Sequence, residues 1–410
     1  MRTDIPSGWK MRKLGELSSF QNGAAFKPTE WSPTGKPIIR IQNLNGGNDF
    51  NYFDGEIDKK FGVSDGDLLF CWSGSRGTSF GPRYWHGPNG WLNQHIFNCH
   101  PAEGISKEYL YFLLDQLTLQ IEMQAHGGAG LVHIKKSELV KFEYAIPEPS
   151  EQDRIAEILT SVDDSIRATE AVIAQAERVK LGLMDDLLNG GFGNEAIARG
   201  EVPEGWKATT ASEIAVTKGL QTGPFGSQLK ASEYYDGESE EVTHVVMPKD
   251  IVDGVINFST CARITNERAD ALEKHKLQKG DVLFARRGDL SKVAVFDGEE
   301  NSAICGTGCL RLRPNMNLVT YDFLRLVFTS HMSVQWLIAH AVGATMPNLN
   351  TEIIGKLPLA TPPIDEQERI SGSLNSIERE ISANSVVRNQ LKRLKRGLMD
   401  DLLTGRVRTV

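Results

Sequence analysis

Apolar residues recur at alternating steps of four and three along two stretches of the chain, residues 151–189 and 366–404. This spacing places one apolar stripe along a helix and is typical of a coiled-coil seam. The stripe consists of Ile155, Leu159, Val162, Ile166, Thr169, Ile173, Ala176, Lys180, Leu183 and Leu187, and then of Ile370, Leu374, Ile377, Ile381, Asn384, Arg388, Leu391, Lys395, Leu398 and Leu402. A proline precedes each stretch and a glycine follows it, as start and stop signals do. Each stretch predicts one helix of about 39 residues, a rod about 58 Å long.

The rest of the chain, residues 1–150 and 190–365, has the pattern of mixed α/β domains. Short β-rich runs alternate there with turns rich in Gly, Asn and Asp. The predicted strands are Pro37–Leu44, Asp67–Trp72, Val242–Met247, Val282–Ala285 and Lys292–Phe296. Each segment also has one helical stretch, Lys107–Gln124 in the first and Tyr321–Ala339 in the second.

The two long helices are expected to pair with each other. A rod of about 58 Å is longer than a domain of ~150 residues, so packing of each rod on its own domain is the weaker alternative. Antiparallel pairing would place one α/β segment at each end. The flanking residues Val172, Val179, Val387 and Leu394 predict a wider seam where they occur. The fold class is therefore α/β (α+β), with domains at residues 1–150 and 190–365 and coiled-coil helices at residues 151–189 and, including the C-terminal tail, 366–410.

Four motifs occur twice in the same order, which indicates an internal, pseudo-twofold repeat. EQDRI at residues 151–155 returns as EQERI at 366–370, and GLMDDLLNG at 182–190 returns as GLMDDLLTG at 397–405, both 215 residues later. GWK at 8–10 returns at 205–207, and GDLLF at 66–70 returns as GDVLF at 280–284. The glycine-rich loops after the last pair differ between the copies. Altered loops on a repeated scaffold are typical of two binding units with different specificity.

The composition of the 410-residue chain, with 40% hydrophobic and 24% charged residues, is that of a soluble globular protein. No apolar run approaches the ~20 residues of a membrane span, and no secretion signal opens the sequence, so we expect a cytoplasmic protein. The five cysteines are expected to be buried free thiols, since Cys305 and Cys309 have no second ligand pair at zinc spacing. The net charge of −8 argues against nucleic acid binding, although a local basic site remains compatible with it.

The motifs of several enzyme classes are absent from the sequence. No Asn/Asp-Pro-Pro-Tyr/Phe motif for an extruded base, no phosphate loop ending in Gly-Lys-Ser/Thr, and no metal-binding His pair occurs. His126 and His133 flank a glycine-rich loop, but the second copy has Ala341 and Asn348 in their places. A catalytic site would rarely be halved in this way. We therefore expect neither a catalytic residue nor a metal site in this chain.

The ordered, duplicated motifs resemble the specificity subunit of type I restriction–modification systems, over essentially the whole chain. The segments at residues 35–44 and 223–234 and the C-terminal LLTGRVRTV are also typical of that family. The resemblance implies two target-recognition domains, each reading one half of a split site in double-stranded DNA. It implies further that two methyltransferase subunits dock on the helices and that restriction and translocase subunits join through them. The chain itself would be non-catalytic and bind no cofactor, with S-adenosylmethionine on the methyltransferase partner, and would not contact a membrane.

Three alternatives stay open at this point. The chain could serve a related system whose partner is a fused nuclease–methylase. It could be an enzyme with an unrecognised active site, which activity of the purified chain would reveal. It could also be a coiled-coil scaffold that never touches DNA, although this leaves the divergent loops on matched strands unexplained.

Base recognition uses Arg or Lys for guanine, Asn or Gln for adenine, and small polar groups on loops. On this ground the DNA-reading residues predicted in the first domain are Lys27, Arg40, Gln42, Asn43, Ser75, Arg76, Arg83, His133 and Lys135. Those predicted in the second domain are Gln221, Ser227, Gln228, Lys230, Arg286, Arg287, Asn348 and Asn350. The alternative for each is a solvated loop residue or a salt bridge. Trp31, Trp72 and Phe225 could stack on bases, but core packing is the favoured interpretation for them.

Overall fold

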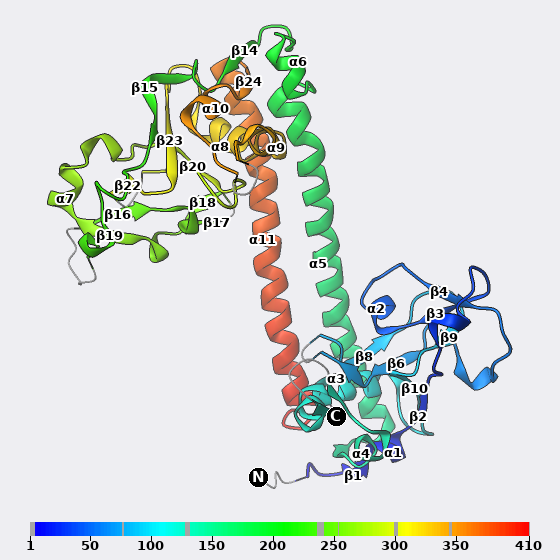
Figure 1. The fold of residues 1–410 in the computed structure, drawn as a ribbon. Coiled ribbons are helices and arrows are strands. Elements are labelled where there is room, and N and C mark those ends of the chain that lie inside the picture. The colour runs from blue at the N-terminus through cyan, green and yellow to red at the C-terminus, as the bar shows by residue number, and fades with distance from the viewer. Residues whose placement is uncertain are drawn as a thin grey trace. The chain divides into compact units, whose positions relative to one another are not determined.

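The structure is a computed structural model that describes residues 5–75, 78–127, 132–235, 242–252, 254–298, 302–343 and 347–409. The chain forms two compact units. Unit 1 consists of Met1–Ala171 and Ser385–Val410, and unit 2 consists of Val172–Asn384. Each long helix therefore contributes one half to each unit (Figure 1). This grouping divides the chain differently from the four sequence segments, whose boundaries stay a prediction.

Both predicted long helices are present. Helix α5 spans Pro149–Asn189 and helix α11 spans Ile364–Leu402, each within two residues of the predicted bounds. Every position of the predicted stripe is buried or half-buried on both helices, so the seam is confirmed. The flanking residues are exposed instead, with 43% exposure for Val172 and 51% for Leu394. The prediction of a wider seam is wrong, because side chains beside a two-residue stripe point past the partner helix.

The helix segments of unit 1 run antiparallel. Lys395 Nζ lies 2.8 Å from Asp163 Oδ1, and Lys392 Nζ lies 2.7 Å from Glu170 Oε1. A later residue on α5 thus meets an earlier residue on α11. The antiparallel pairing predicted from the sequence is confirmed within this unit.

The repeat reuses the same ion pair in unit 2. There Lys180 Nζ lies 2.7 Å from Glu378 Oε1. Lys180 and Glu378 are the counterparts of Lys395 and Asp163 at the repeat offset of 215 residues. The two helices have therefore exchanged the roles of donor and acceptor between the units, as a pseudo-twofold repeat requires.

The α/β part of unit 1 contains, among the described residues, two four-stranded sheets and two smaller ones. The first sheet has the order β2 (Ser18–Asn22), β10 (Ile96–Pro101), β6 (Leu68–Cys71) and β8 (Gly81–Tyr84), all antiparallel. The second has the order β4 (Asn51–Phe53), β3 (Lys36–Ile39), β9 (Gly90–Leu92) and β5 (Gly62–Val63). The small sheets are β11 (His126–Gly127), β12 (Val132–His133) and β7 (Ser73–Gly74), and the pair β1 (Lys10–Lys13) and β13 (Glu143–Ile146). The helices are α1 (Leu14–Leu17), α2 (Ile41–Leu44), α3 (Lys107–Gln124) and α4 (Lys136–Leu139), with 3-10 turns at Pro28–Glu30 and Lys59–Phe61.

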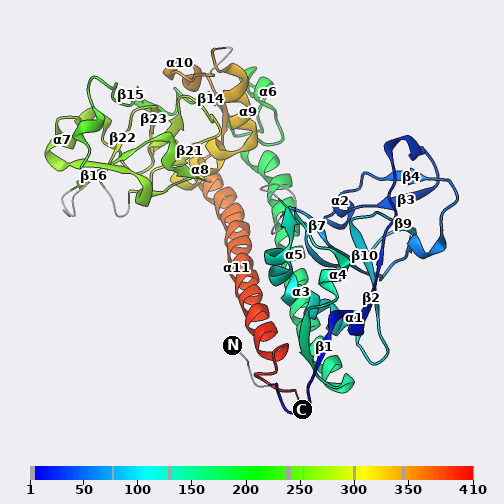
Figure 2. The same ribbon diagram turned by 60° about the horizontal axis from the view of Figure 1, so that its bottom comes forward.

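Unit 2 repeats this plan (Figure 2). Its four-stranded sheet, counted over the described residues, has the order β15 (Ala215–Thr222), β23 (Cys309–Pro314), β20 (Val282–Ala285) and β21 (Val293–Val295). Smaller sheets are β19 (Ala262–Thr265), β16 (Val242–Val246) and β22 (Ala303–Cys305), then β14 (Lys207–Thr210) with β24 (Pro358–Thr361), and β17 (Ile251–Val252) with β18 (Val255–Ile256). The helices are α6 (Asn194–Ala198), α7 (Asn266–Asp270), α8 (Tyr321–Thr329), α9 (His331–His340) and α10 (Thr351–Gly355), with 3-10 turns at Ala231–Glu233, Pro248–Asp250, Phe258–Thr260 and Glu273–His275.

Two predicted elements differ from the structure. The run Pro37–Leu44 is not one strand, because β3 ends at Ile39 and residues 41–44 form α2. The stretch Tyr321–Ala339 is not one helix, because Ser330 adopts an extended conformation (φ −64°, ψ 147°) and separates α8 from α9. The Ser330 hydroxyl accepts a hydrogen bond from the Ser333 N–H and so caps the new helix.

The repeated EQxRI motif joins each long helix to the helix of its α/β part. Gln152 Nε2 donates to the Pro147 carbonyl (3.0 Å), and Gln152 Oε1 accepts from the Ser106 N–H (3.0 Å) at the N-cap of α3. In unit 2, Gln367 Oε1 accepts from the N–H of Thr320 (2.8 Å), the N-cap of α8. Both glutamines are fully buried. The amide thus satisfies buried backbone groups that would otherwise be costly, which explains its repetition.

The glycine that ends each GLMDDLL-x-G motif makes room for the proline that precedes the GWK motif of the same unit. Gly190 and Gly405 have positive φ angles of 64° and 71°. A Cβ on Gly190 would lie 2.1 Å from Pro203 Cγ, and one on Gly405 would lie 2.4 Å from Pro6 Cγ. Each proline stands just before a GWK motif. Both the backbone conformation and the close contact therefore require glycine.

The core of each unit combines its main sheet with the long helices. In unit 1, α3 packs on the first sheet, and residues of α5 and α11 such as Ile155 and Leu402 belong to the same buried cluster. In unit 2, α8 packs on β21, and Leu188 and Leu374 enter the equivalent cluster. Each α/β part thus shares one core with its portions of the two helices, which hold its outer loops on a fixed base.

Candidate nucleic-acid interface

Several predicted loops of unit 1 converge on one short loop, Asn93–His95, between β9 and β10. The Asn93 N–H donates to the carbonyl of Ile39 at the end of β3 (3.0 Å), and the Trp72 N–H after β6 donates to the His95 carbonyl (3.3 Å). The N–H of Gly23, directly after β2, donates to the Ile96 carbonyl (3.1 Å). Three strand ends that are distant in sequence therefore meet at residues 93–96.

Unit 2 builds the same junction around Gly306–Gly308. The Gly306 N–H donates to the Val246 carbonyl (2.9 Å), and the Arg286 N–H donates to the Gly308 carbonyl (2.8 Å). The Gly223 N–H donates to the Cys309 carbonyl (3.0 Å). A Cβ on Gly223 would lie 2.0 Å from the Gly306 carbonyl oxygen, so this close backbone approach requires glycine.

A further loop joins the junction in each unit. In unit 1 the Ile134 N–H donates to the Trp72 carbonyl (3.1 Å), and His133 pairs with Ser73 in the β12–β7 ladder. In unit 2 the Leu349 N–H donates to the Arg286 carbonyl (2.9 Å), and Asn348 forms a bridge with Arg287. We name residues 23–27, 39–43, 72–75, 93–95 and 132–135 loop cluster 1. Residues 223–230, 246–250, 286–287, 306–308 and 347–350 are loop cluster 2.

Loop cluster 1 contains seven of the nine residues predicted for the first domain. Lys27, Gln42, Ser75, His133 and Lys135 have exposed side chains there. The Arg40 guanidinium stacks on the Trp31 ring at 4.4 Å, so this pair presents a planar cation with an aromatic face. Asn43 is buried instead, and its amide bonds the carbonyls of Gly47 (3.1 Å) and Asp49 (3.0 Å). These hydrogen bonds give the Asn43 side chain the role of holding the loop rather than of contacting DNA.

The two remaining predictions of the first domain fall elsewhere. Arg76 lies outside the described residues. Arg83 belongs to β8, and its Nη1 donates to the Pro82 carbonyl (2.7 Å) on the side of the sheet near Thr118 of α3. The structure therefore does not bring Arg83 together with the loops of cluster 1.

Loop cluster 2 brings together Ser227, Lys230, Arg286, Arg287 and Asn348. Arg286 Nε donates to Asn348 Oδ1 (3.3 Å), so a guanidinium and a side-chain amide share one edge. These are the two side-chain types that read guanine and adenine. The side chains of Arg287, Ser227 and Lys230 in the same loop cluster are exposed.

The other predictions of the second domain have bonds that hold the loops. Asn350 Oδ1 accepts from the Ile353 N–H (2.8 Å) and caps α10. Gln228 Oε1 accepts from the Phe225 N–H (3.2 Å). Gln221 lies on strand β15 rather than on a loop, and its Nε2 donates to the Lys218 carbonyl (3.2 Å).

Comparison with known proteins identifies the family. The family model for the type I restriction modification DNA specificity domain matches residues 6–178 and 239–393. The chain belongs to this family. It is 22% identical to the MjaVIII specificity subunit of Methanocaldococcus jannaschii, over 98% of this chain and 94% of that protein. It is 21% identical to the EcoBI specificity subunit of Escherichia coli, over 92% and 82% of the two chains.

Solved structures share the fold of this specificity subunit. The S subunit of a type I restriction–modification system from M. genitalium superposes with a TM-score of 0.59 at 15% identity, covering 98% of both chains. A chain from a study of complex assembly and conformational transition of the type I R-M system also gives a TM-score of 0.59, at 18% identity, covering 99% of this chain and 100% of that one. The fold class expected from the sequence is thereby confirmed.

The DNA-reading residues predicted from the sequence do not include those of the junction loop of the specificity subunit. Gln94 and His95 are exposed at the centre of loop cluster 1, where unit 2 has only Gly306, Thr307 and Gly308. Partial burial lowers the pKa of His95, and His133 nearby lowers it further, so a neutral imidazole is favoured. The signal was available, because these residues directly precede matched strands and differ between the copies.

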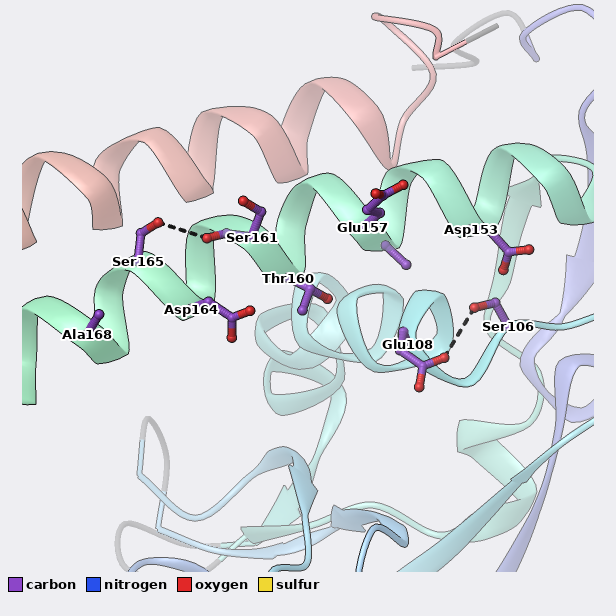
Figure 3. A pocket seen from close by; sticks show the side chains of 10 residues that line it. Ser106, Glu108, Asp153, Glu157, Thr160, Ser161, Asp164, Ser165 and Ala168 are labelled. Carbon is purple, nitrogen blue, oxygen red and sulfur yellow. Dashed lines mark hydrogen bonds between the residues drawn. The ribbon is translucent and has the colours of Figure 1, made fainter.

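A groove of about 710 Å³ lies on unit 1 between the start of α3 and the side of α5 (Figure 3). Its lining residues are Ser106, Glu108, Asp153, Ala156, Glu157, Thr160, Ser161, Asp164, Ser165 and Ala168. Four of these are carboxylates and none is a cation. The other six lining residues are small serine, threonine or alanine residues. This acidic lining is unsuited to DNA phosphates.

The described part of the subunit offers little sign of other chemistry. No group of three or more His, Cys, Asp and Glu side chains within it could hold a metal ion. The cysteines are free, and four of them, including Cys305 and Cys309, are buried, whereas Cys261 is half-buried. No helix in the described residues is both long and apolar enough to cross a bilayer.

Proposed function

We propose that the specificity subunit reads a bipartite target in double-stranded DNA, with loop cluster 1 on one half-site and loop cluster 2 on the other. The supporting observation is that the same backbone junction is built twice with different side chains. In unit 1 the junction residues Gln94 and His95 face the bases. In unit 2 Arg286 and Asn348 face them. Loops that share one backbone arrangement but carry different side chains are suited to reading two different base sequences.

The chain reads DNA without catalysing a reaction. Methyltransferase subunits, two per chain, supply S-adenosylmethionine and the methyl transfer, and restriction subunits join through them. The curated relatives are named as specificity subunits of type I restriction enzymes, which supports this division of labour.

We propose that one of the two methyltransferase subunits docks on the acidic groove of unit 1. Glu108, Asp153, Glu157 and Asp164 line it without a cation, so a basic helix complements its charge. The corresponding face in the second repeat is less acidic, since Gly372 and Arg379 take the places of Glu157 and Asp164. Glu157→Lys with Asp164→Lys is expected to weaken methyltransferase binding in calorimetry, whereas Glu267→Lys with Glu273→Lys, exposed acids of unit 2, leaves it unchanged. Equal affinity of both variants would refute this docking site.

Co-expression with the partner methyltransferase in an unmethylated host, followed by methylome sequencing, tests the function directly. The expected result is one bipartite motif with adenine methylation. An unmodified genome from an intact complex would contradict sequence-specific reading and favour the scaffold alternative. A partner gene that encodes nuclease and methylase in one chain would place the subunit in the related system.

A further inference from the structure

Phe225 is an unusually exposed aromatic side chain in loop cluster 2. It is 56% exposed, and no other phenylalanine in the described residues is classed as exposed. Among the tryptophans of the same residues only Trp31 is exposed, at 37%, and the Arg40 guanidinium covers one of its faces. Exposing a large apolar ring loses the gain of burial, so the position calls for an explanation.

The loop that carries Phe225 is fixed at its start. The Thr307 hydroxyl donates to the Pro224 carbonyl (3.0 Å), and Gly223 packs directly against the Gly306 backbone. The Phe225 N–H donates to Gln228 Oε1 (3.2 Å), and the Phe225 carbonyl accepts from the Gln228 N–H (2.7 Å). Both backbone groups of Phe225 are therefore satisfied, and the loop holds one conformation without help from the ring.

The loop is also anchored at its end. Leu229 is buried at 2% exposure in the cluster that includes Val245 and Ile304. Arg268 of α7 donates to the Gln228 carbonyl and pairs with Glu233 (Nε to Oε1, 2.7 Å). The ring thus projects from a loop that is tied down on both sides, which is how a protein presents a preorganised contact.

The loop that carries Phe225 adjoins the loop that carries Arg286. Thr307, which holds Pro224, precedes Gly308, whose carbonyl accepts from the Arg286 N–H. Loop cluster 1 lacks an equivalent, because Phe26 in the loop after β2 is half-buried and packs edge-on against Phe53 at 5.2 Å. Among the described residues, an exposed phenylalanine ring is therefore found in loop cluster 2 and not in loop cluster 1.

We propose that Phe225 is an apolar wedge that stacks on a base of the second half-site and opens the step beside it. This deepens the proposed function and rests on it. Proteins that distort DNA insert such rings between base steps, and neighbouring cations hold the phosphates while they do so. Lys230, Arg286 and Arg287 supply those cations here. A flanking glycine, Gly226, whose Cβ would meet no atom within 4 Å, leaves space for the backbone of the nucleic acid.

The test uses the complex of full-length subunit and methyltransferase with duplexes that contain its methylated motif. 2-Aminopurine replaces one base at a time in the second half-site, and fluorescence reports unstacking. The wild-type complex is expected to raise the fluorescence at one position. Phe225→Ala is expected to abolish that rise and to weaken binding about 10-fold, whereas Phe225→Trp keeps both. Val255→Ala, at a residue of the same unit that is 57% exposed outside loop cluster 2, serves as the matched control and changes neither.

The outcomes are distinct. Wild-type fluorescence and affinity in Phe225→Ala would overturn the wedge and leave the proposed function intact. Normal DNA binding by Phe225→Ala with loss of the methyltransferase would show that the ring contacts protein, and would also overturn it. A wild-type complex that fails to discriminate its own motif would overturn the proposed function, and the wedge with it. Unchanged thermal unfolding of Phe225→Ala, expected for an exposed side chain, shows that the loss is not a folding defect.

Discussion

Arg408→Ala is expected to destabilise unit 1 strongly, because it removes the main partner of a buried carboxylate. The Glu151 side chain is only 3% exposed and lies in the first turn of α5. Arg408 Nε lies 2.7 Å from Glu151 Oε1, and Arg408 Nη2 lies 2.8 Å from Glu151 Oε2. The indole Nε1 of Trp9 donates to the same Oε2 (3.1 Å). One carboxylate thus ties together the GWK opening, the start of a long helix and the C-terminal tail.

The magnitude follows from what Arg408→Ala leaves behind. Removing one partner of a buried ion pair costs about 3–5 kcal/mol, since the remaining charge is desolvated and uncompensated. Arg408 is itself 29% exposed, so solvent screening places the expected loss at the lower end, about 3 kcal/mol. That loss would lower the melting temperature by roughly 6–12 °C for a unit of this size. Glu151→Gln combined with Arg408→Ala is expected to lose less than Arg408→Ala alone, because no charge then stays buried.

Urea unfolding of the subunit at several pH values measures this effect. The hydrogen bonds from Arg408 lower the pKa of Glu151, so the pair stabilises the fold fully above the ordinary glutamate pKa. The stabilisation disappears as the pH falls through the lowered value, and the gap between wild type and Arg408→Ala narrows in acid. Glu366→Gln is the matched control, since this repeat counterpart has no ion pair in the described structure. A loss below about 0.5 kcal/mol for Arg408→Ala at pH 7 would refute the reasoning.

Arg286→Ala is expected to reduce the discrimination between bases by ~1–3 kcal/mol at one base pair of the second half-site alone, measured in binding assays with substituted half-sites. Equal weakening of binding to all sequences would indicate a phosphate contact instead. Lys395→Ala, which breaks a mostly buried pair, should cost about 3 kcal/mol in urea unfolding, whereas Lys356→Ala, in an exposed pair, leaves the midpoint unchanged. Exchange of residues 1–150 for a foreign recognition domain should change one half of the methylated motif, and a change in both halves would contradict independent reading. Burial raises the pKa of Cys305 to about 12, so iodoacetamide at pH 8 should label it only after unfolding, and rapid native labelling would contradict that burial.

The long helices and the repeat could be predicted because their signals are local. A stripe at steps of four and three faces one side of any helix, so Ile155 and Leu374 belong to the seam whatever their partner is. The stop glycines act through the backbone conformation of their own residue, and the duplicated motifs are visible by comparing the chain with itself. The same local signals identified the family.

The candidate site could be predicted only as a set of loops. Asn43, Asn350 and Ser227 are all small polar residues in the predicted loops. Asn43 nevertheless donates to two carbonyls, Asn350 caps a helix, and Ser227 stays exposed. Which polar side chain is free depends on the backbone groups that approach it. Those groups come from distant parts of the chain, so no local pattern reports them.

The sequence by itself determined the two long helices, their bounds to within two residues, and which residues recur in the two copies, because these properties depend on neighbours within a few positions or on comparing the chain with itself. Tertiary structure alone decided how the loops meet. Arg286 reaches Gly308 and Asn348 only because β20 and β23 pair in one register and Asn348 and Leu349 lie beside them. Tertiary structure also decided the exposure of Phe225. Its loop is anchored against Gly306 and leaves outside the core a ring whose apolar character would place it inside.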